Sequence, residues 1–280
     1  MGTRELRGRC ALCSRVCTLS VIAIRGEQVG GSRAGYRVVM NRDERDDRPE
    51  AKPPAIHLYQ ETPALAPVDA LAGGTWIGVN AHGLTFTLMN RTDTVKPAPP
   101  ERPLSRGLII PALAHHARLE DAIEAARALD WSRYPPCRLT IFAPGAVVAA
   151  SPRIATFSWS GDAQIGKGVD ESIFASPAAC FASSGLGDAL VQIRVQLFEQ
   201  TVQGGLDPSG QSGFHQHRWP ESSPTSVLMS RPAHRTVSIT TVEVGETITM
   251  AYSPVRRATG PGTDELVVTE PVLASLVRRD

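Results

Sequence analysis

The first residue that could do chemistry is Cys17, which stands directly before the apolar, β-branched run TLSVIAI. A cysteine in this position is most often a small buried hydrophobe. A cysteine that begins a chain is different, because its free α-amine, with an ordinary pKa of about 7.7–8.0, can take the thiol proton near neutral pH and leave a nucleophile. Cys17 is therefore either part of the core or a nucleophile, depending on whether its α-amine is free.

A second candidate is the tetrapeptide Asn41-Arg42-Asp43-Glu44, which follows the apolar run YRVVM. Charged residues in such a cluster usually form a solvated turn with local ion pairs. Placed beside a cysteine they would act on the thiol, since a nearby guanidinium lowers a thiol's pKa. The residues alone leave both interpretations open.

The elements that must position these residues are predicted to be mostly strands. Apolar, β-branched runs indicate single strands over residues 17–24, 36–43, 137–144, 146–151, 153–160, 171–177, 225–230, 235–244 and 246–253. Residues 75–90 are predicted to form a hairpin of two strands around a short turn at residues 80–83. Helices are predicted over residues 105–116, 119–130 and 187–202. The proline-rich residues 49–67 and the Gly/Ser/Pro-rich residues 204–224 are predicted to be loops. Because this order lacks a βαβ alternation, we expect an α+β protein with antiparallel sheets and helices packed outside them.

Composition excludes several classes of function. The chain has 29 basic and 28 acidic residues, so its charge gives no reason to expect binding to nucleic acid or to an anionic membrane surface. No stretch approaches the roughly 20 apolar residues of a membrane span, and there is no apolar core of a secretory signal, so we expect a cytoplasmic protein. Five scattered cysteines agree with a reducing compartment. Cys10-x-x-Cys13 has no second cysteine pair, so no metal site is predicted.

The pattern CTLSVIAI, YRVVMNRDE, RP and LAGGTWIGVNAHGLTFTLMN, dense over residues 17–90, resembles the NRDE family, which includes the animal transport and Golgi organisation protein 2. SSGLGD and RTVSITTVEV extend the resemblance more loosely toward the C-terminus. It implies an αββα sandwich, similar to the N-terminal nucleophile hydrolases, with two stacked antiparallel sheets between helical layers. We therefore expect one NRDE-type domain over residues 17–280.

The residues before Cys17 depart from this family, whose members begin Met-Cys. Residues 1–16 are arginine-rich and aperiodic, and we expect them to be a disordered or non-native N-terminal extension. Either a pro-segment is cut between Val16 and Cys17, or Val16 is a GTG start codon in an over-extended reading frame. We favour the second, and both would free the α-amine of Cys17.

The resemblance implies roles for individual residues. Cys17 would be the nucleophile, Arg42 and Asp43 would orient its amine and thiolate, and Asn80 of GVNAHGL would donate to the oxyanion. Asn80 is equally well explained as a turn residue before Gly83. The residues expected to bind substrate or to support the site are Asn41, Glu44, Trp76, Asn90, Ser184 and Arg235.

These roles predict a hydrolase-like enzyme that cleaves a non-peptide or small amide bond, or transfers its acyl group, with a small molecule as substrate. The alternative is a non-catalytic haem-related or lipid-related binding or trafficking protein on the same fold. No cofactor is expected for the enzyme. Haem is kept for the alternative, although the seven histidines include no Cys-x-x-Cys-His site. The sequence does not set the oligomeric state.

Overall fold

The computed structural model describes residues 17–24, 35–91, 103–145, 151–161, 169–184, 187–203, 207–258 and 265–279. The prediction of an extension at residues 1–16 lies outside the described residues, as does nearly all of the predicted strand at 146–151. Within the described residues, no helix is long and apolar enough to cross a membrane.

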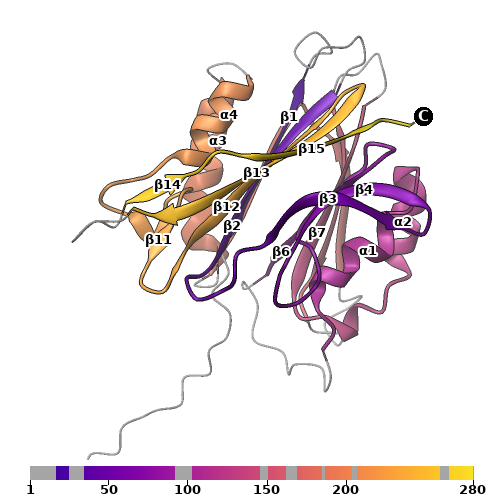
Figure 1. Ribbon diagram of the computed structural model, residues 1–280, viewed down its shortest axis with the longest axis horizontal. Helices are drawn as coiled ribbons and strands as arrows, with labels where there is room; N and C mark the ends of the chain where they lie inside the picture. The colour runs from indigo at the N-terminus through magenta and orange to yellow at the C-terminus, as the bar shows by residue number, and fades with distance from the viewer. Residues whose placement is uncertain are drawn as a thin grey trace, which may run out of the picture.

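The described strands form two antiparallel sheets (Figure 1). The first sheet has the order β10-β1-β2-β12-β13-β14, with β11 beside β12 and β15 beside β13. Its strands are β10 (Ala178–Ser183), β1 (Cys17–Ile24), β2 (Gly35–Arg45), β12 (His234–Val244), β13 (Thr247–Arg257), β14 (Leu266–Val268), β11 (Ser230–Arg231) and β15 (Val272–Val277). The second sheet runs in chain order through β3 (Lys52–Tyr59), β4 (Thr62–Val68), β5 (Ile77–Asn80), β6 (Thr85–Asn90), β7 (Cys137–Ala143), β8 (Arg153–Trp159) and β9 (Val169–Ala175).

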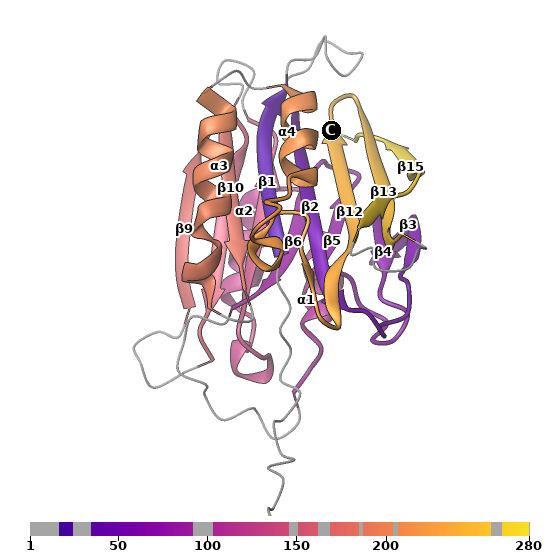
Figure 2. The same ribbon diagram turned by 90° about the vertical axis from the view of Figure 1, so that its left-hand side faces the viewer.

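Helices cover the outer face of each sheet (Figures 1 and 2). On the first sheet, α3 (Gln192–Gln203) and α4 (Pro208–Gln216) pack against β10, β1 and β2. On the second sheet, α1 (Ile109–Leu113) and α2 (Leu119–Arg127) pack against β6 and β7. Short 3-10 helices complete the described chain: η2 (Arg106–Leu108), η3 (Trp131–Arg133), η4 (Asp188–Val191) and η5 (Ser223–Thr225). The expected αββα sandwich is confirmed.

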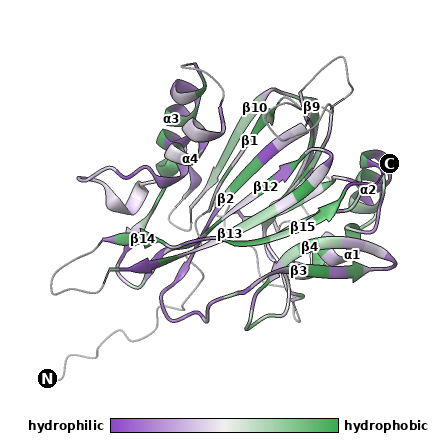
Figure 3. Ribbon diagram, turned by 45° about the horizontal axis from the view of Figure 1, so that its top comes forward, coloured by the Kyte–Doolittle hydropathy of each residue, from purple (hydrophilic) through white to green (hydrophobic). Residues whose placement is uncertain are grey.

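The alternation of side chains along β1 explains why this strand is apolar on both faces. Leu19 and Val21 point into the core between the sheets, where they join Met40 of β2 and Phe142 of β7. Ile22 and Ile24 point outward into the hydrophobic cluster under α3 and α4. Because successive side chains in a strand face opposite sides, a strand covered on both faces must be apolar at nearly every position. Figure 3 colours β15 as apolar too, although Leu273 and Val277 of this strand are exposed.

Two predicted loops are wrong. Residues 49–67 contain β3 and most of β4, and residues 204–224 contain α4. The prolines at the start of β3 are tolerated because β3 is the edge strand of its sheet and does not need every backbone N–H for pairing. Helix α4 begins with Pro208 in its first turn, and the Asp207 side chain accepts a hydrogen bond from the Gly210 N–H at 2.6 Å. The sequence analysis missed these capping residues because the glycines and serines of this segment are typical of a loop.

The predicted helices at 119–130 and 187–202 are confirmed as α2 and as η4 followed by α3. The predicted helix at 105–116 is shorter, since it contains only η2 and α1. The predicted hairpin at 75–90 is confirmed as β5 and β6 around the turn at Gly83, whose φ of 76° favours glycine.

Candidate active site

The residues that could do chemistry meet at one end of the sandwich, where β1 begins and where β2 and β6 end. A cavity of about 90 Å³ lies there, which we call the cysteine pocket. Two loops complete its wall, one before β5 and one that includes η2. The lining residues are Cys17, Arg42, Asp43, Glu44, Arg48, Asp69, Ala72, Gly74, Thr75, Trp76, Leu88, Met89, Asn90, Ser105, Arg106 and Gly107.

Strand pairing fixes the surroundings of Cys17. The residue stands opposite Arg42 in the β1–β2 ladder and opposite Ser183 in the β1–β10 ladder. Residues directly opposite in an antiparallel pair have their side chains on the same face. The Ser183 hydroxyl is buried and has no hydrogen-bond partner within the described residues. Cys17 therefore has a cationic neighbour on one side and an unused hydroxyl on the other.

The thiol of Cys17 is held in its neutral form. Burial raises its pKa to about 12, and the negative charge of Asp43 adds to the effect. The backbone N–H of Asp43 and the charge of Arg42 act in the opposite direction but do not overcome burial. A thiol with this pKa carries almost no thiolate near neutral pH. In this state the sulfur needs a base before it can attack.

Asp43 belongs to a second group of charged residues near the cysteine, which includes Arg194 of α3. Its carboxylate accepts a hydrogen bond from Thr236 Oγ1 at 2.5 Å and lies 3.6 Å from the guanidinium of Arg194, which comes from α3. Burial raises the pKa of Asp43 to about 7, although the charge of Arg194 opposes this shift. Its second oxygen, Oδ2, has no hydrogen-bond partner among the described residues. Asp43 can therefore exchange a proton near neutral pH.

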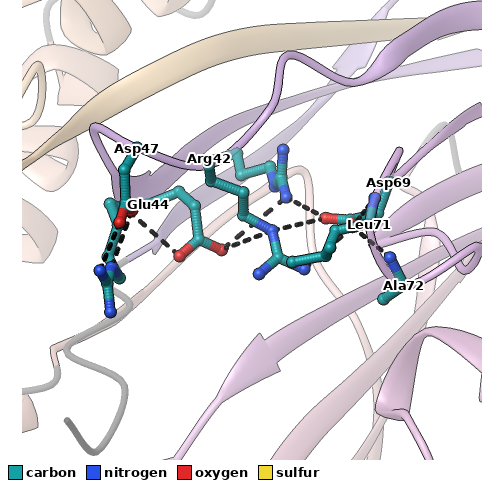
Figure 4. A network of polar contacts seen from close by, with 8 residues as sticks. Arg42, Glu44, Asp47, Asp69, Leu71 and Ala72 are labelled. Atoms are coloured by element: carbon teal, nitrogen blue, oxygen red, sulfur yellow. Dashed lines mark hydrogen bonds and ion pairs between the residues drawn. The ribbon is translucent and has the colours of Figure 1, made fainter.

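Arg42 is fixed by contacts on three sides, and Figure 4 shows the two acidic ones, Asp69 and Glu44. Its guanidinium pairs with the carboxylate of Asp69, lies 3.8 Å from Glu44, and stacks 4.2 Å over the ring of Trp76. Arg48 joins the same group through hydrogen bonds of 2.9 Å to both oxygens of Asp69. The structure brings Arg42, Glu44 and Trp76 together in the lining of the cysteine pocket.

Asn80 does not reach the cysteine pocket, so the structure contradicts its expected oxyanion role. It is fully buried in the β5–β6 turn, where its side-chain amide donates to the backbone carbonyls of Ala114 and His116. Its side-chain oxygen accepts from the backbone N–H groups of His82 and Leu84. All of its hydrogen-bonding capacity is used to hold the turn. Asn90, at the opposite end of β6, lines the pocket instead.

Three other predicted residues lie outside the pocket lining. Asn41 points to the outer face of the first sheet, where it binds the ring and the backbone of His215. Ser184 is buried, and its backbone N–H donates to Asp188. Arg235 lines a neighbouring cavity. Of the supporting residues, Glu44, Trp76 and Asn90 are therefore brought to the cysteine and these three are not.

The sequence analysis missed Arg48, Asp69, Arg106 and Arg194. Arg48 belongs to the RP element of the family pattern, and that was the one available signal for it. Asp69 follows a proline-rich stretch that contains no motif. Its position depends on the loop that carries it, where its carboxylate accepts hydrogen bonds from the backbone N–H groups of Leu71 and Ala72. Arg194 lies within an amphipathic helix and meets Asp43 only through tertiary packing.

The described residues contain no group of three or more His, Cys, Asp or Glu side chains that could hold a metal ion. The chemistry available at the cysteine pocket is that of a thiol, a carboxylic acid with a pKa near neutrality, a fixed guanidinium, and amide and hydroxyl donors. Such a set suits attack on a carbonyl carbon, with an amide or hydroxyl to stabilise the developing oxyanion.

Comparison with known proteins identifies the chain's relatives. Residues 27–136 match the family model described as Transport and Golgi organisation 2, which confirms the resemblance to the NRDE family. No curated protein matches the sequence.

Among solved structures, a Caenorhabditis elegans orthologue of N-acylethanolamine-hydrolyzing acid amidase aligns with a TM-score of 0.49 and 12% identity over 80% of this chain and 91% of its own. Penicillin V acylase from Agrobacterium tumefaciens aligns with a TM-score of 0.46 and 12% identity, over 90% of this chain and 86% of its own. A variant of the conjugated bile acid hydrolase from Clostridium perfringens aligns with a TM-score of 0.48 and 8% identity, over 93% of this chain and 97% of its own.

Proposed function

With residues 27–136 matching the Transport and Golgi organisation 2 family, we propose that this chain is an N-terminal-cysteine hydrolase-like enzyme that cleaves a small, non-peptide amide or transfers its acyl group. The observation that carries the proposal is the position of Cys17. It is the first residue of β1, it lines a cavity, and strand pairing sets it opposite Arg42 and Ser183.

The proposal requires a base for the thiol, because burial raises the pKa of Cys17 to about 12. An amide nitrogen is not a base, so an internal Cys17 would stay protonated. A free α-amine on Cys17 has an ordinary pKa of about 7.7–8.0 and would take the proton without any other side chain. Catalysis is therefore tied to the form of the protein in which Cys17 is the first residue.

The reaction then runs through an acyl-enzyme. The α-amine takes the thiol proton, Sγ bonds to the carbonyl carbon, and the carbonyl electron pair moves to oxygen. When the carbonyl re-forms, the carbon–nitrogen bond breaks and the leaving amine departs with the proton from the α-ammonium. Water attacks the resulting thioester and the α-amine takes its proton; the carbon–sulfur bond then breaks as the α-ammonium returns that proton to sulfur, which releases the carboxylic acid and restores the thiol and the free amine. In acyl transfer an acceptor amine or alcohol replaces water.

In this proposal the neighbouring residues bind the α-ammonium and stabilise the oxyanion. Asp43 Oδ2 is buried, lies 3.6 Å from Arg194 and accepts no hydrogen bond within the described residues, so it would receive the α-ammonium. Arg42 is held by Asp69 and Trp76, so its charge is preorganised beside the sulfur. Asn90 and Ser183 replace Asn80 as the oxyanion donors in this proposal, because Asn90 lines the pocket and Ser183 stands opposite Cys17.

The test compares two preparations on a panel of small N-acyl amides with chromogenic leaving groups. In the first, residues 1–15 are removed and Val16 is replaced by Met, so that removal of the initiator leaves Cys17 with a free amine. The second is the full chain with residues 1–16 retained. We expect turnover only in the first, and its loss in Cys17→Ala.

Cys180→Ala is the matched control, because Cys180 is a free cysteine in the neighbouring strand and does not line the pocket. It should keep the activity. Equal turnover in the Cys17→Ala protein would end the proposal. So would intact-mass data showing that the protein made from its native gene keeps residues 1–16.

A further inference from the structure

A second cavity, of about 250 Å³, shares Arg42 and Arg48 with the cysteine pocket. We call it the arginine cavity. The remaining lining residues are Pro49, Glu50, Ala51, Arg235, Val237, Tyr252, Val255 and Arg256. Tyr252 packs against Trp76, with ring centroids 6.4 Å apart, so the two aromatic rings and Arg42 stand between the two cavities.

The lining of the arginine cavity is strongly cationic, with four arginines against a single carboxylate, that of Glu50. The acids that pair with Arg42 and Arg48 are Asp69 and Glu44, and both line the cysteine pocket instead. Glu50 pairs with Arg256 at 3.1 Å, and both side chains are more than half exposed. The guanidinium groups therefore outnumber the acids on the inside of this cavity.

Among the described residues that line the arginine cavity, Arg235 has incomplete hydrogen bonding. Its Nε is buried and has no hydrogen-bond partner within the described residues. Its ion pair with Asp46 is long at 3.4 Å. A buried charged donor without an acceptor is unfavourable, and a guanidinium offers its Nε and a terminal nitrogen together to two oxygens of one anion.

We propose that the arginine cavity binds an oxyanion, the carboxylate or phosphate of a small molecule, with Arg235 as its main donor. The arginines of the lining would attract the anion, and the Nε of Arg235, which has no hydrogen-bond partner within the described residues, marks where the anion would bind. A ligand anchored here would lie against Arg42, the residue that both cavities share and that stands opposite Cys17. A link between this ligand and the reaction rests on the proposed function, whereas oxyanion binding does not.

Binding is tested by calorimetry on the full chain carrying Cys17→Ala, so that no turnover is needed. Inorganic phosphate and succinate are titrated separately at constant ionic strength. We expect saturable binding of one of them, and the one that binds identifies the chemical class of the anion. Arg235→Gln should weaken this binding by about tenfold or more, since it removes a charge-assisted pair of hydrogen bonds.

Arg257→Gln is the matched control. Arg257 also pairs with Asp46, at 3.0 Å, but it does not line the arginine cavity, so its replacement should leave the affinity within about twofold. If Arg235→Gln does not fold, Arg235→Lys serves in its place, because lysine keeps the charge and lacks the fork. The proposal is overturned if neither anion binds saturably, if both glutamine variants lose binding equally, or if Arg235→Lys binds as tightly as the parent chain.

Discussion

Cys17 carries a thiol whose reactivity is limited first by burial and then by the negative charge of Asp43. With a pKa of about 12, the folded full-length chain holds a thiolate fraction near pH 8 that is on the order of a thousandfold below that of an unfolded cysteine. We expect iodoacetamide to modify Cys17 at least about 100-fold more slowly in the folded protein than in urea. Peptide mapping by mass spectrometry measures this ratio, and similar rates in the two states would show that the thiol is not protected.

Asp43 is predicted to give the protein an unusual pH dependence. Its pKa is about 7 in the folded state, against about 4 in an unfolded chain, so the folded state retains a proton that the unfolded state has lost. Stability from this group is therefore present below about pH 4 and is lost as the pH rises through about 7, by a total on the order of 4 kcal/mol. Asp43→Asn keeps an oxygen to accept from Thr236 and removes the titration.

Urea unfolding of the parent and of Asp43→Asn between pH 4 and pH 8 measures this effect. The free energy of unfolding of the parent should fall relative to the variant as the pH rises. A difference between the two proteins that does not change over this range would contradict the assignment of a raised pKa to Asp43.

At the scale of elements, α4 is joined to the first sheet by a buried hydrogen-bonded chain. His215 Nε2 lies 2.7 Å from the Ser20 hydroxyl of β1, and His215 Nδ1 lies 2.8 Å from the Asn41 side chain of β2. Gln211, one turn earlier, donates to the same Ser20 oxygen at 2.8 Å. This network orients the two strands that carry Cys17 and Arg42 while remaining outside the pocket itself.

The network predicts a second pH effect of opposite sign. Burial, together with the charges of Arg37 and Arg194, lowers the pKa of His215 well below its ordinary value. A histidine of this kind is neutral in the folded state, so its contribution to stability is present above about pH 6.5 and is lost as the pH falls below it. The parent protein should lose about 1.4 kcal/mol per pH unit from this group.

His215→Gln should flatten this acid-side loss, at the cost of lower stability at pH 7, because part of the buried network is then left unsatisfied. Thermal unfolding at pH 5, 6 and 7 separates the two effects. His217→Gln is a suitable control, because His217 lies just beyond the end of α4 and the His215 network does not include it. Parallel stability curves for the parent and His215→Gln would refute the assignment.

The elements also show what could be predicted from the sequence. The run that became β1 is apolar at most positions, β2 has an apolar centre over residues 38–40, and β12 is rich in β-branched residues, so each local pattern favours the strand that forms. Asn80 and Asn90 both end predicted strands, and one-dimensional spacing cannot tell which end of the hairpin faces the cysteine. Strand β6 is 6 residues long, so the two amides lie roughly 20 Å apart, a distance decided by how the second sheet stacks on the first.

At the scale of the whole molecule, the two sheets are joined by contacts at the end opposite the cysteine pocket. The hydroxyl of Tyr36 in the first sheet donates to the carbonyl of Gly83 in the β5–β6 turn of the second, at 2.7 Å. The backbone N–H of Arg279, just after β15, donates to the carbonyl of Ala81 in the same turn, also at 2.7 Å. The last residues of the chain therefore help to hold the sheets together.

Removing residues 272–280 should destabilise the protein severely. It takes away β15, whose inward residues Ala274 and Leu276 pack on the core between the sheets, and it leaves β13 with an unpaired edge. We expect a soluble yield and a melting temperature far below those of a control that lacks only residue 280. A truncated chain that melts within a few degrees of the control would show that β15 is dispensable.

The pairing of β2 with β12 has a consequence for how the protein is made. Arg42 lies opposite Ser238 in that ladder, so the strand that carries the candidate site is completed by a segment from the other end of the chain. Contacts between segments so distant in sequence form slowly, because a long loop must close first. On the ribosome, β1 and β2 must wait until β12 and β13 have emerged, and in the meantime their apolar faces are open to chaperones. A message truncated before β12 would therefore yield a chain that contains Cys17, Arg42 and Asp43 but never assembles them.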